Sequence, residues 1–315
     1  MMKRKRLRRW LRPSRKASEN KMQKTILVTG ANGQLGRAVK KAYAGQDVTL
    51  IETEAPAVAG KTGHRALDIT DAGQVAAAVA DAKADVIINC AAYTAVDKQE
   101  EDSDLSYLIN AIGPRNLAMA AERHGAQLIH VSTDYVFDGR ASRPYTEWDP
   151  TSPQSVYGRS KLAGEQMVQM FCGRFAILRT AWLYGDGNNF ARTMLRLSGT
   201  HDTVSVVDDQ TGTPTSADAL SLAVRALAFT DNYGIFHATC EGSCSWADFA
   251  EEVFRLAGKD TRVERVSTAE YTKKNPQSAP RPMYSILDNM MLRLTGACTF
   301  PDWHEALEDY MRQMI

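Results

Sequence analysis

The chain has 315 residues, of which 44% are hydrophobic and 24% charged, the balance of an ordinary globular protein. This length is enough for two domains with cores that need no disulfide or metal to fold. No run of 18 apolar residues occurs, so the sequence predicts no membrane-spanning helix, and its composition excludes collagen-like and wholly disordered chains.

The net charge of +1 conceals an uneven distribution of charge. Ten of the 38 Lys and Arg residues, but one of the 37 acidic residues, lie in residues 1–21, so the other 294 residues carry a net charge of −8. An acidic body gives no reason to expect a nucleic-acid partner. Residues 1–21 are predicted to be a disordered basic extension, or sequence upstream of a start at Met22; a tail that binds nucleic acid or a membrane surface is the alternative. No apolar stretch follows the basic residues, as a secretory signal would require.

Five cysteines are present, an odd number without a paired framework. Together with the lack of a secretory signal, this pattern favours a reducing cytoplasm. Cys240 and Cys244 have no second ligand pair nearby in sequence, so no zinc site is expected.

Strands and helices are predicted to alternate along the first 180 residues. Short β-branched runs favour strands, and longer stretches favour helices. In chain order these are a strand at 24–30, a helix at 34–44, strands at 47–52 and 85–90 around a helix at 71–82, a helix at 105–124, a strand at 126–132, a helix at 157–171 and a strand at 175–179. This alternation predicts an α/β fold of the Rossmann type, a doubly wound parallel sheet with helices on both faces.

The regular alternation weakens after Thr180. We therefore expect a dinucleotide-binding domain over residues 22–180 and a smaller, mainly substrate-binding lobe over residues 181–315. Helices are predicted near 216–229, 246–257 and 302–314, and the chain is expected to return to the first domain around residues 205–235.

A glycine-rich turn, GxxGxxG, joins the first strand to the first helix. Gly30 permits the tight turn, Gly33 lets the backbone approach a pyrophosphate, and Gly36 lets helix and strand pack closely. A plain glycine turn is the alternative, but the position within a βαβ series favours a dinucleotide site. The cofactor residues expected in the turn are Gly30, Asn32, Gly33, Gln34, Leu35 and Gly36.

The choice between NADPH and NADH is left open by two residues of opposite charge. Glu52, at the predicted end of the second strand, suits the ribose hydroxyls of NADH and repels a 2′-phosphate. Arg37, just after the turn, suits that phosphate instead. Asp68 and Ile69 are expected along the adenine, with helix capping by Thr70 or Asp71 as the alternative.

Tyr157 and Lys161 stand four residues apart, so they share a face of the predicted helix. A neighbouring ammonium is expected to lower the pKa of the tyrosine. A hydroxyl from the preceding strand end, Ser132 or Thr133, would orient a carbonyl. Although YxxxK alone is common in structural helices, its place after the glycine turn predicts hydride transfer coupled to protonation of a carbonyl.

With these motifs the chain resembles the extended short-chain dehydrogenase/reductase family, and within it the dTDP-4-dehydrorhamnose reductases, over nearly all of residues 24–315. The similarity rests on TGANGQLG (29–36), NCAAYTAVD (89–97), INAIGPRNLA (109–118), STDYVFDG (132–139), YGRSK (157–161), RTAWLYG (179–185), NNFARTML (188–195), DDQTGTPT (208–215) and APRP (279–282).

The resemblance implies that NADPH or NADH reduces the 4-keto group of a nucleotide sugar, dTDP-4-dehydro-L-rhamnose, to dTDP-L-rhamnose. It implies Thr133, Tyr157 and Lys161 as the catalytic set. Further cofactor contacts are implied for Ala91, Ala92, Tyr93 and Asn110, as well as Tyr157 and Lys161. Substrate contacts are implied for Asp134, Tyr135, Trp182, Asn189, Phe190, Gln210 and Arg281.

Some relatives bind Mg²⁺ at a dimer interface, but the matching position in the first helix is Ala38, which cannot ligate a cation. Mg²⁺ is therefore not expected, although Asp218, which matches another ligand position, is acidic. A homodimer is left open.

Two rival functions are weighed. A dehydratase or epimerase of the same fold is disfavoured because Tyr135 stands where dehydratases carry a glutamate. A silent regulatory binding subunit is disfavoured because it would not require Tyr157 and Lys161.

Overall fold

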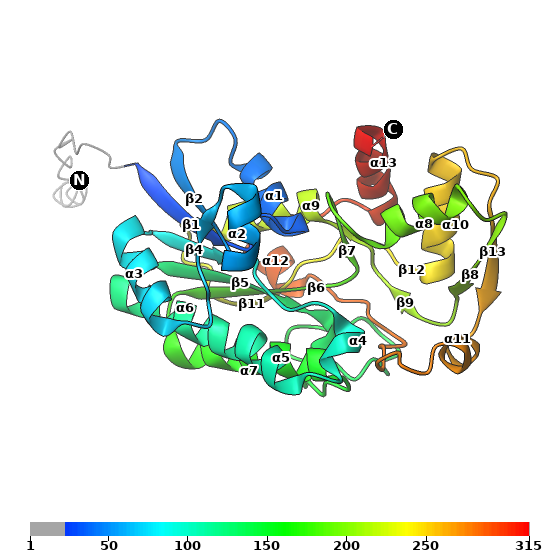
Figure 1. Ribbon diagram of the computed structural model, residues 1–315, viewed down its shortest axis with the longest axis horizontal. Coiled ribbons are helices and arrows are strands. Elements are labelled where there is room, and N and C mark those ends of the chain that lie inside the picture. Colours follow the sequence, from blue (N-terminus) through cyan, green and yellow to red (C-terminus); the bar gives the residue numbers. More distant parts are fainter. Residues whose placement is uncertain (1–22, 315) are drawn as a thin grey trace, which may run out of the picture.

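The computed structural model describes residues 23–314 and has a seven-stranded parallel sheet at its centre (Figure 1). The strands are β1 (Lys24–Thr29), β2 (Val48–Glu54), β3 (Arg65–Ala66), β4 (Val86–Asn89), β5 (Gln127–Thr133), β6 (Phe175–Thr180) and β11 (Gly234–His237). Their order is β3-β2-β1-β4-β5-β6-β11, and every neighbouring pair is parallel. This arrangement confirms the predicted α/β fold. The order reverses between β1 and β4, where ligands bind at the carboxyl ends of such strands.

Helices cover both faces of the sheet (Figure 1). On one face lie α1 (Gln34–Ala42) and α9 (Ala217–Leu227); on the other lie α3 (Ala72–Ala82), α6 (Gly113–His124) and α7 (Val156–Phe171). Alternate strand residues serve the two cores: Ile26 and Val28 pack on the α1 side, and Leu27 on the α3 side. Strands buried on both faces explain the uninterrupted apolar runs in the sequence.

The helix predicted at 105–124 is divided into three parts. They are α5 (Ser103–Tyr107), a π-helical turn (Leu108–Ile112) and α6, which has Pro114 in its first turn. Proline lacks the N–H that a continuous α-helix would require at this point. The π-helical turn contains Asn110, which is 1% exposed, and such turns often occur at functional sites.

The remaining elements form the second part of the chain and the loops around the sheet. They are α2 (Pro56–Thr62), α4 (Val96–Gln99), a 3₁₀ turn (Asp134–Val136), β7 (Leu183–Tyr184), α8 (Phe190–Ser198), β8 (Thr203–Val207), β9 (Thr211–Gly212), β10 (Thr215–Ser216), β12 (Cys244–Ser245), α10 (Trp246–Leu256), β13 (Arg262–Val266), α11 (Thr268–Lys274), α12 (Met290–Thr295) and α13 (Trp303–Met314). The chain returns to the sheet between these elements, since α9 packs against α1 and β11 pairs with β6.

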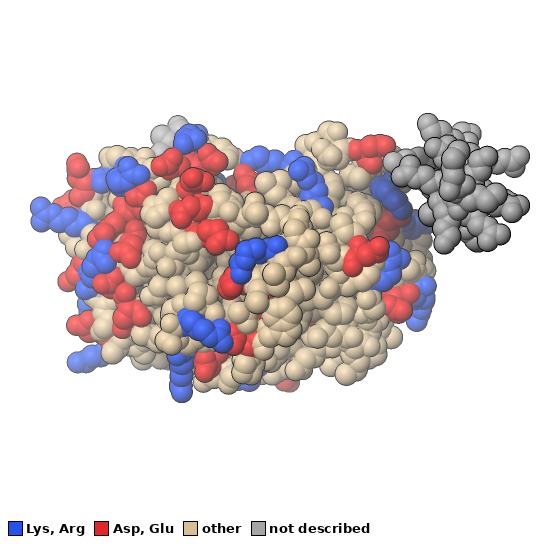
Figure 2. Space-filling view, turned by 180° about the vertical axis from the view of Figure 1, so that it is seen from behind, with Lys and Arg blue, Asp and Glu red and all other residues tan. Residues whose placement is uncertain are grey.

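The predictions from composition concern the basic segment, membrane-spanning helices and the cysteines. The basic segment 1–21 lies outside the described residues. Within 23–314, no helix is long and apolar enough to cross a bilayer, and all five cysteines are free thiols. Figure 2 shows acidic and basic side chains interspersed on one face, with no large basic patch.

Candidate active site

The glycine turn between β1 and α1 has the shape that a bound pyrophosphate needs. Gly30 has a left-handed φ of +65°, and a Cβ there would lie 2.7 Å from the backbone nitrogen of Ala91. A Cβ at Gly36 would lie 2.6 Å from the Cα of Ala31, so only glycine allows this close packing. Gly33 is the N-cap of α1, without a side-chain cap or an acid in the first turn. The helix dipole and the N–H groups of the first turn therefore suit a phosphate.

A cavity of about 410 Å³ opens beside this turn. The predicted cofactor residues that line it are Gly30, Asn32, Gly33, Asp68, Ile69, Ala91 and Ala92. Its place at the switch point of the sheet and its size suit the adenosine half of a dinucleotide. No lysine or arginine belongs to its lining among residues 23–314. Asp71 caps α3 by accepting hydrogen bonds from the N–H groups of Gly73 and Gln74. Asp68 does not have this role and lines the cavity.

Two acids, Glu54 and Asp68, line this cavity, whereas Glu52, the predicted ribose ligand, does not. β2 runs two residues further than predicted because its end pairs with the short strand β3. Glu52 lies outside the cavity, 2.9 Å from the Nζ of Lys40 and 3.2 Å from the Nε2 of His64. Glu54 lines the cavity, and its Oε2 accepts a hydrogen bond from the backbone N–H of Asn32 at 2.9 Å.

Several other predicted cofactor residues do not line the cavity, among them Leu35, Tyr93 and Asn110. Leu35 is buried in the core, so its side chain is not free for a ligand. Asn110 accepts from the backbone N–H of Tyr93 at 2.9 Å, and its Nδ2 donates to the Oγ of Ser160 at 3.1 Å. Asn110 therefore ties the segment after β4 to helix α7 and acts on the site by positioning these two elements.

Thr133, Tyr157 and Lys161 come together at the carboxyl edge of the sheet. Thr133 ends β5, and the other two residues lie one turn apart on α7. The Thr133 hydroxyl is close enough to the Tyr157 phenol to lower its pKa. The Lys161 ammonium donates to the backbone carbonyl of Val131 at 2.6 Å. Of the two hydroxyls left open by the sequence, Thr133 is therefore the one beside the phenol, while Ser132 donates elsewhere.

The pKa of Tyr157 moves in the direction opposite to the prediction. Burial raises it to about 12, and the nearby Thr133 hydroxyl opposes this only in part. Lys161 is not among the groups that shift this pKa, since its ammonium is directed at a backbone carbonyl. The phenol is therefore protonated at neutral pH, the state that a proton donor to a carbonyl requires.

Two neighbouring groups titrate closer to neutrality. Burial lowers the pKa of Lys161 to about 8, against the attraction of the Glu165 carboxylate. Burial also raises the pKa of Asp134 to about 6, and the nearby hydroxyls of Ser285 and Thr133 oppose this rise. The Oγ1 of Thr133 lies 2.8 Å from the Oδ1 of Asp134, whereas the buried Oδ2 has no partner within the described residues.

A second cavity, of about 450 Å³, adjoins the catalytic residues through Tyr135. Tyr135 connects the two, since it lines the cavity and packs edge-on against Tyr157 with ring centres 5.2 Å apart. Met194 and Leu197 add apolar wall. The predicted substrate residues that line this cavity are Tyr135, Trp182, Phe190, Gln210 and Arg281.

An aromatic stack forms one wall of this cavity. The rings of Trp182 and Trp246 lie parallel at 3.6 Å, and Phe190 packs 4.6 Å from Trp246. Trp182 has a left-handed φ of +48°, which costs free energy in a non-glycine residue and is typical of binding sites. Trp246 and Tyr271 line the cavity but were not predicted, because neither stands in a motif.

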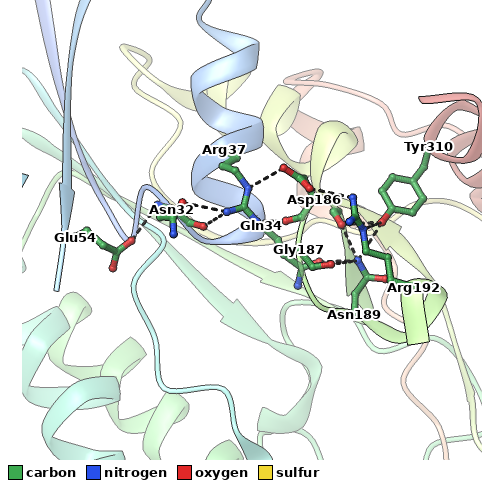
Figure 3. A network of polar contacts seen from close by, with 10 residues as sticks. Asn32, Gln34, Arg37, Glu54, Asp186, Gly187, Asn189, Arg192 and Tyr310 are labelled. Carbon is green, nitrogen blue, oxygen red and sulfur yellow. Dashed lines mark hydrogen bonds and ion pairs between the residues drawn. The ribbon is translucent and has the colours of Figure 1, made fainter. Parts of the chain in front are cut away.

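Asp134 and Asn189 are the two predicted substrate residues that do not line this cavity, and the side chain of Asn189 makes other contacts. Its Oδ1 caps α8 by accepting from the N–H of Arg192 at 3.0 Å. Its Nδ2 lies 3.2 Å from the Oε1 of Gln34 and 3.1 Å from the hydroxyl of Tyr310 (Figure 3). Asn189 does not line the aromatic cavity, and Gln34 does not line the cavity beside the glycine turn. Their side chains instead join the glycine turn to the loop after β7.

The structure offers no ligand set for a metal within residues 23–314, where no group of three His, Cys, Asp or Glu side chains is suitably placed. Ala38 is buried in α1. The Oδ2 of Asp218 lies 2.6 Å from the Nζ of Lys41, so this acid has a lysine as its partner.

Comparison with known proteins agrees with this geometry. The family model described as the RmlD substrate binding domain matches residues 23–315. A dTDP-4-dehydrorhamnose reductase of Streptomyces griseus is 43% identical over 90% of this chain and 91% of its own length. The chain belongs to the dTDP-4-dehydrorhamnose reductase family. It is thus an NAD(P)H-dependent oxidoreductase with an extended short-chain dehydrogenase/reductase fold.

Two solved structures extend the comparison with this reductase family. A dTDP-4-dehydrorhamnose reductase of Clostridium acetobutylicum has a TM-score of 0.86 and 49% identity, over 92% of this chain and 99% of its own. The protein of the same name from Bacillus anthracis, in complex with NADP, has a TM-score of 0.86 and 41% identity, over 93% and 100%. The similarity therefore covers both the sheet and the second part of the chain.

Proposed function

We propose that the protein reduces the 4-keto group of dTDP-4-dehydro-L-rhamnose to give dTDP-L-rhamnose. The observation that carries this proposal is the contact between Tyr157 and Tyr135, a lining residue of the second cavity, in a chain that has two cavities of different character. One cavity adjoins a phosphate-binding glycine turn, and the other is aromatic and bordered by Arg281. Such an arrangement brings a reduced nicotinamide and a sugar ketone together at one phenol.

The catalytic residues have separate roles in this reaction. When bound, the nicotinamide supplies the hydride for the carbonyl carbon. Tyr157 gives its proton to the carbonyl oxygen, and Thr133 donates a hydrogen bond to that oxygen. Lys161 holds the nicotinamide ribose. The glycine turn holds the pyrophosphate, and Asp68 and Ile69 border the adenine.

The nucleotide sugar is assigned to the aromatic cavity. Tyr135 and the stack of Trp182 on Trp246 offer flat apolar surfaces to the sugar and the base. Arg281 lies on the border between this cavity and a smaller one of about 180 Å³. Its guanidinium lies 3.0 Å from the carboxylate of Asp97, and it can neutralise a diphosphate. Asp134, buried beside Thr133, is assigned to a sugar hydroxyl.

Purified protein mixed with dTDP-4-dehydrorhamnose and a reduced nicotinamide is expected to consume the near-ultraviolet absorbance of that cofactor. Product analysis should then show dTDP-L-rhamnose. The matched control is dTDP-glucose, which a dehydratase would convert without net consumption of reduced nicotinamide. Absence of turnover with both NADH and NADPH, in protein that binds them, would support the silent binding subunit.

The kcat/KM of this reaction is expected to follow a bell-shaped pH profile. Lys161 loses its charge as the pH rises through about 8, and Asp134 gains a proton as the pH falls through about 6. The phenol of Tyr157 stays protonated throughout, because its pKa is about 12. Initial rates at low substrate concentration from pH 5 to 9 test this. Asp134→Asn should remove the acid limb alone, and a profile that is flat over this range contradicts both assignments.

We also assign the protein to the cytoplasm, as the five free thiols favour. A homodimer stays a prediction, which light scattering on the purified protein tests. Neither assignment affects the chemistry assigned to Tyr157.

A further inference from the structure

Three buried polar side chains form a row across three neighbouring strands near their carboxyl ends. Thr29 ends β1, Asn89 ends β4 and His130 lies in β5, and the strand pairing places the three residues side by side. Each of them is at most 1% exposed. The residues two positions earlier on these strands, which share their face of the sheet, are leucine or isoleucine of the apolar core. This polar row therefore interrupts an otherwise apolar face where the strands reach the cofactor cavity.

Hydrogen bonds join the polar row, and their directions are fixed by the groups involved. The Oδ1 of Asn89 accepts from the Oγ1 of Thr29 at 2.6 Å and from the backbone N–H of Ala91 at 3.2 Å. Since a backbone N–H can only donate, the other amide atom of Asn89, Nδ2, is the donor that lies 2.9 Å from the Nδ1 of His130. Nδ1 must then accept, so the neutral ring carries its proton on Nε2.

His130 occupies this position at a cost in stability. The ring is 0% exposed, and its Nε2 has no hydrogen-bond partner within residues 23–314. Burial, and then the charge of Lys161, hold the pKa of His130 well below its usual value, so the ring stays neutral. A buried donor without a partner is unfavourable, and an apolar side chain would avoid this cost. What only the histidine supplies is the Nδ1 acceptor for the Asn89 amide.

The polar row connects the segments that carry the cofactor and catalytic residues. Thr29 immediately precedes the glycine turn and lines the cavity beside it, and Ala91, just after β4, lines the same cavity. His130 precedes Val131, whose backbone carbonyl accepts from the ammonium of Lys161 at 2.6 Å. Side-chain hydrogen bonds therefore hold these three strand ends in one alignment, in addition to the pairing of their backbones.

We infer that His130 is a positioning residue for the proposed reduction. By accepting from Asn89 through Nδ1, it fixes the glycine turn and the segment after β4 in the arrangement that binds the nicotinamide cofactor. His130 does not line the cavity, so it acts through Asn89 and Thr29. The inference rests on the proposed function for the use of that cofactor.

Two variants of equal shape separate the acceptor from the bulk of the ring. In His130→Asn the side-chain oxygen takes the place of Nδ1 and can accept from Asn89, whereas His130→Leu has the same outline without an acceptor. Calorimetric titration of the full chain, in the absence of sugar, gives the dissociation constants for NADH and NADPH. Both are expected to rise about tenfold in His130→Leu, because a buried amide donor loses its partner. In His130→Asn both should stay within about threefold of the unaltered protein.

Two results would overturn the inference. One is a His130→Leu protein that binds both cofactors as tightly as the unaltered chain. The other is a His130→Asn protein that binds them as weakly as His130→Leu, because the acceptor would then have no effect. Where His130→Leu does not fold, His130→Phe, which keeps a ring without an acceptor, takes its place with the same expectation.

Gln127→Leu is the matched control. Gln127 lies at the opposite end of β5, is 2% exposed, and donates through its Nε2 to the backbone carbonyl of Leu227 at 3.0 Å. Its replacement should lower the midpoint of denaturant unfolding and leave both dissociation constants unchanged. A loss of cofactor affinity as large as that of His130→Leu would show that any weakening of β5 has this effect, and would overturn the inference. A failed sugar assay with normal cofactor binding refutes the proposed substrate alone, so the two failures are distinguishable.

Discussion

Tyr157→Phe is expected to lower kcat by about 10²- to 10⁴-fold while leaving the dissociation constant for NADH within about twofold. The substitution removes the proton donor but keeps a ring of the same size, so the edge-on contact with Tyr135 and the course of α7 are preserved. Steady-state kinetics gives the first quantity, and calorimetric titration gives the second.

Tyr43→Phe is the matched control for this experiment. Burial raises the pKa of Tyr43 to about 12, as it does for Tyr157, and the Tyr43 hydroxyl has no hydrogen-bond partner within the described residues. The two phenols therefore match in acidity but not in position, and Tyr43→Phe should keep full kcat. If Tyr157→Phe loses NADH affinity in proportion to kcat, the phenol is structural and the proposed mechanism fails.

The parts of this structure that the sequence predicts are those determined by local spacing. Apolar runs ending in glycine or a hydroxyl residue give the strands, because strands buried on both faces need apolar side chains at every position. Tyr157 and Lys161 share a helix face because their spacing of four residues requires it. The need for glycine at positions 30 and 36 is predictable for the same reason, because the close backbone contacts occur at fixed positions of one turn.

The parts that the sequence does not predict depend on contacts between distant segments. Whether Glu52 or Glu54 lines the cavity beside the glycine turn depends on where β2 ends, and this is decided by pairing with β3. Asn189 matches the substrate motif, yet its side chain is hydrogen-bonded to Gln34 and Tyr310, which lie far away in sequence. The pKa of Tyr157 depends on its burial, which no local pattern reveals.

Beneath the catalytic residues lies a buried ion pair that no motif predicted. Glu165 is one turn after Lys161 on α7 and has no exposed side-chain surface; the Arg179 side chain is 4% exposed. Their closest atoms, Oε2 and Nη2, lie 2.7 Å apart. The Oε1 of Glu165 also accepts from the Oγ of Ser132 at 2.5 Å. The pair therefore joins the catalytic helix to the residue that precedes Thr133.

Glu165→Ala is expected to lower the free energy of unfolding by about 3–5 kcal/mol, since it leaves the Arg179 guanidinium buried without its counter-charge. Denaturant unfolding followed by circular dichroism measures this change. Glu308→Ala, which removes an exposed pair with Arg312, should change stability little. The double variant Glu165→Leu with Arg179→Met should recover about half or more of the loss, because it removes both charges together. If Glu165→Ala costs no more than Glu308→Ala, the pair does not support the site, and the position of Thr133 depends on the sheet alone.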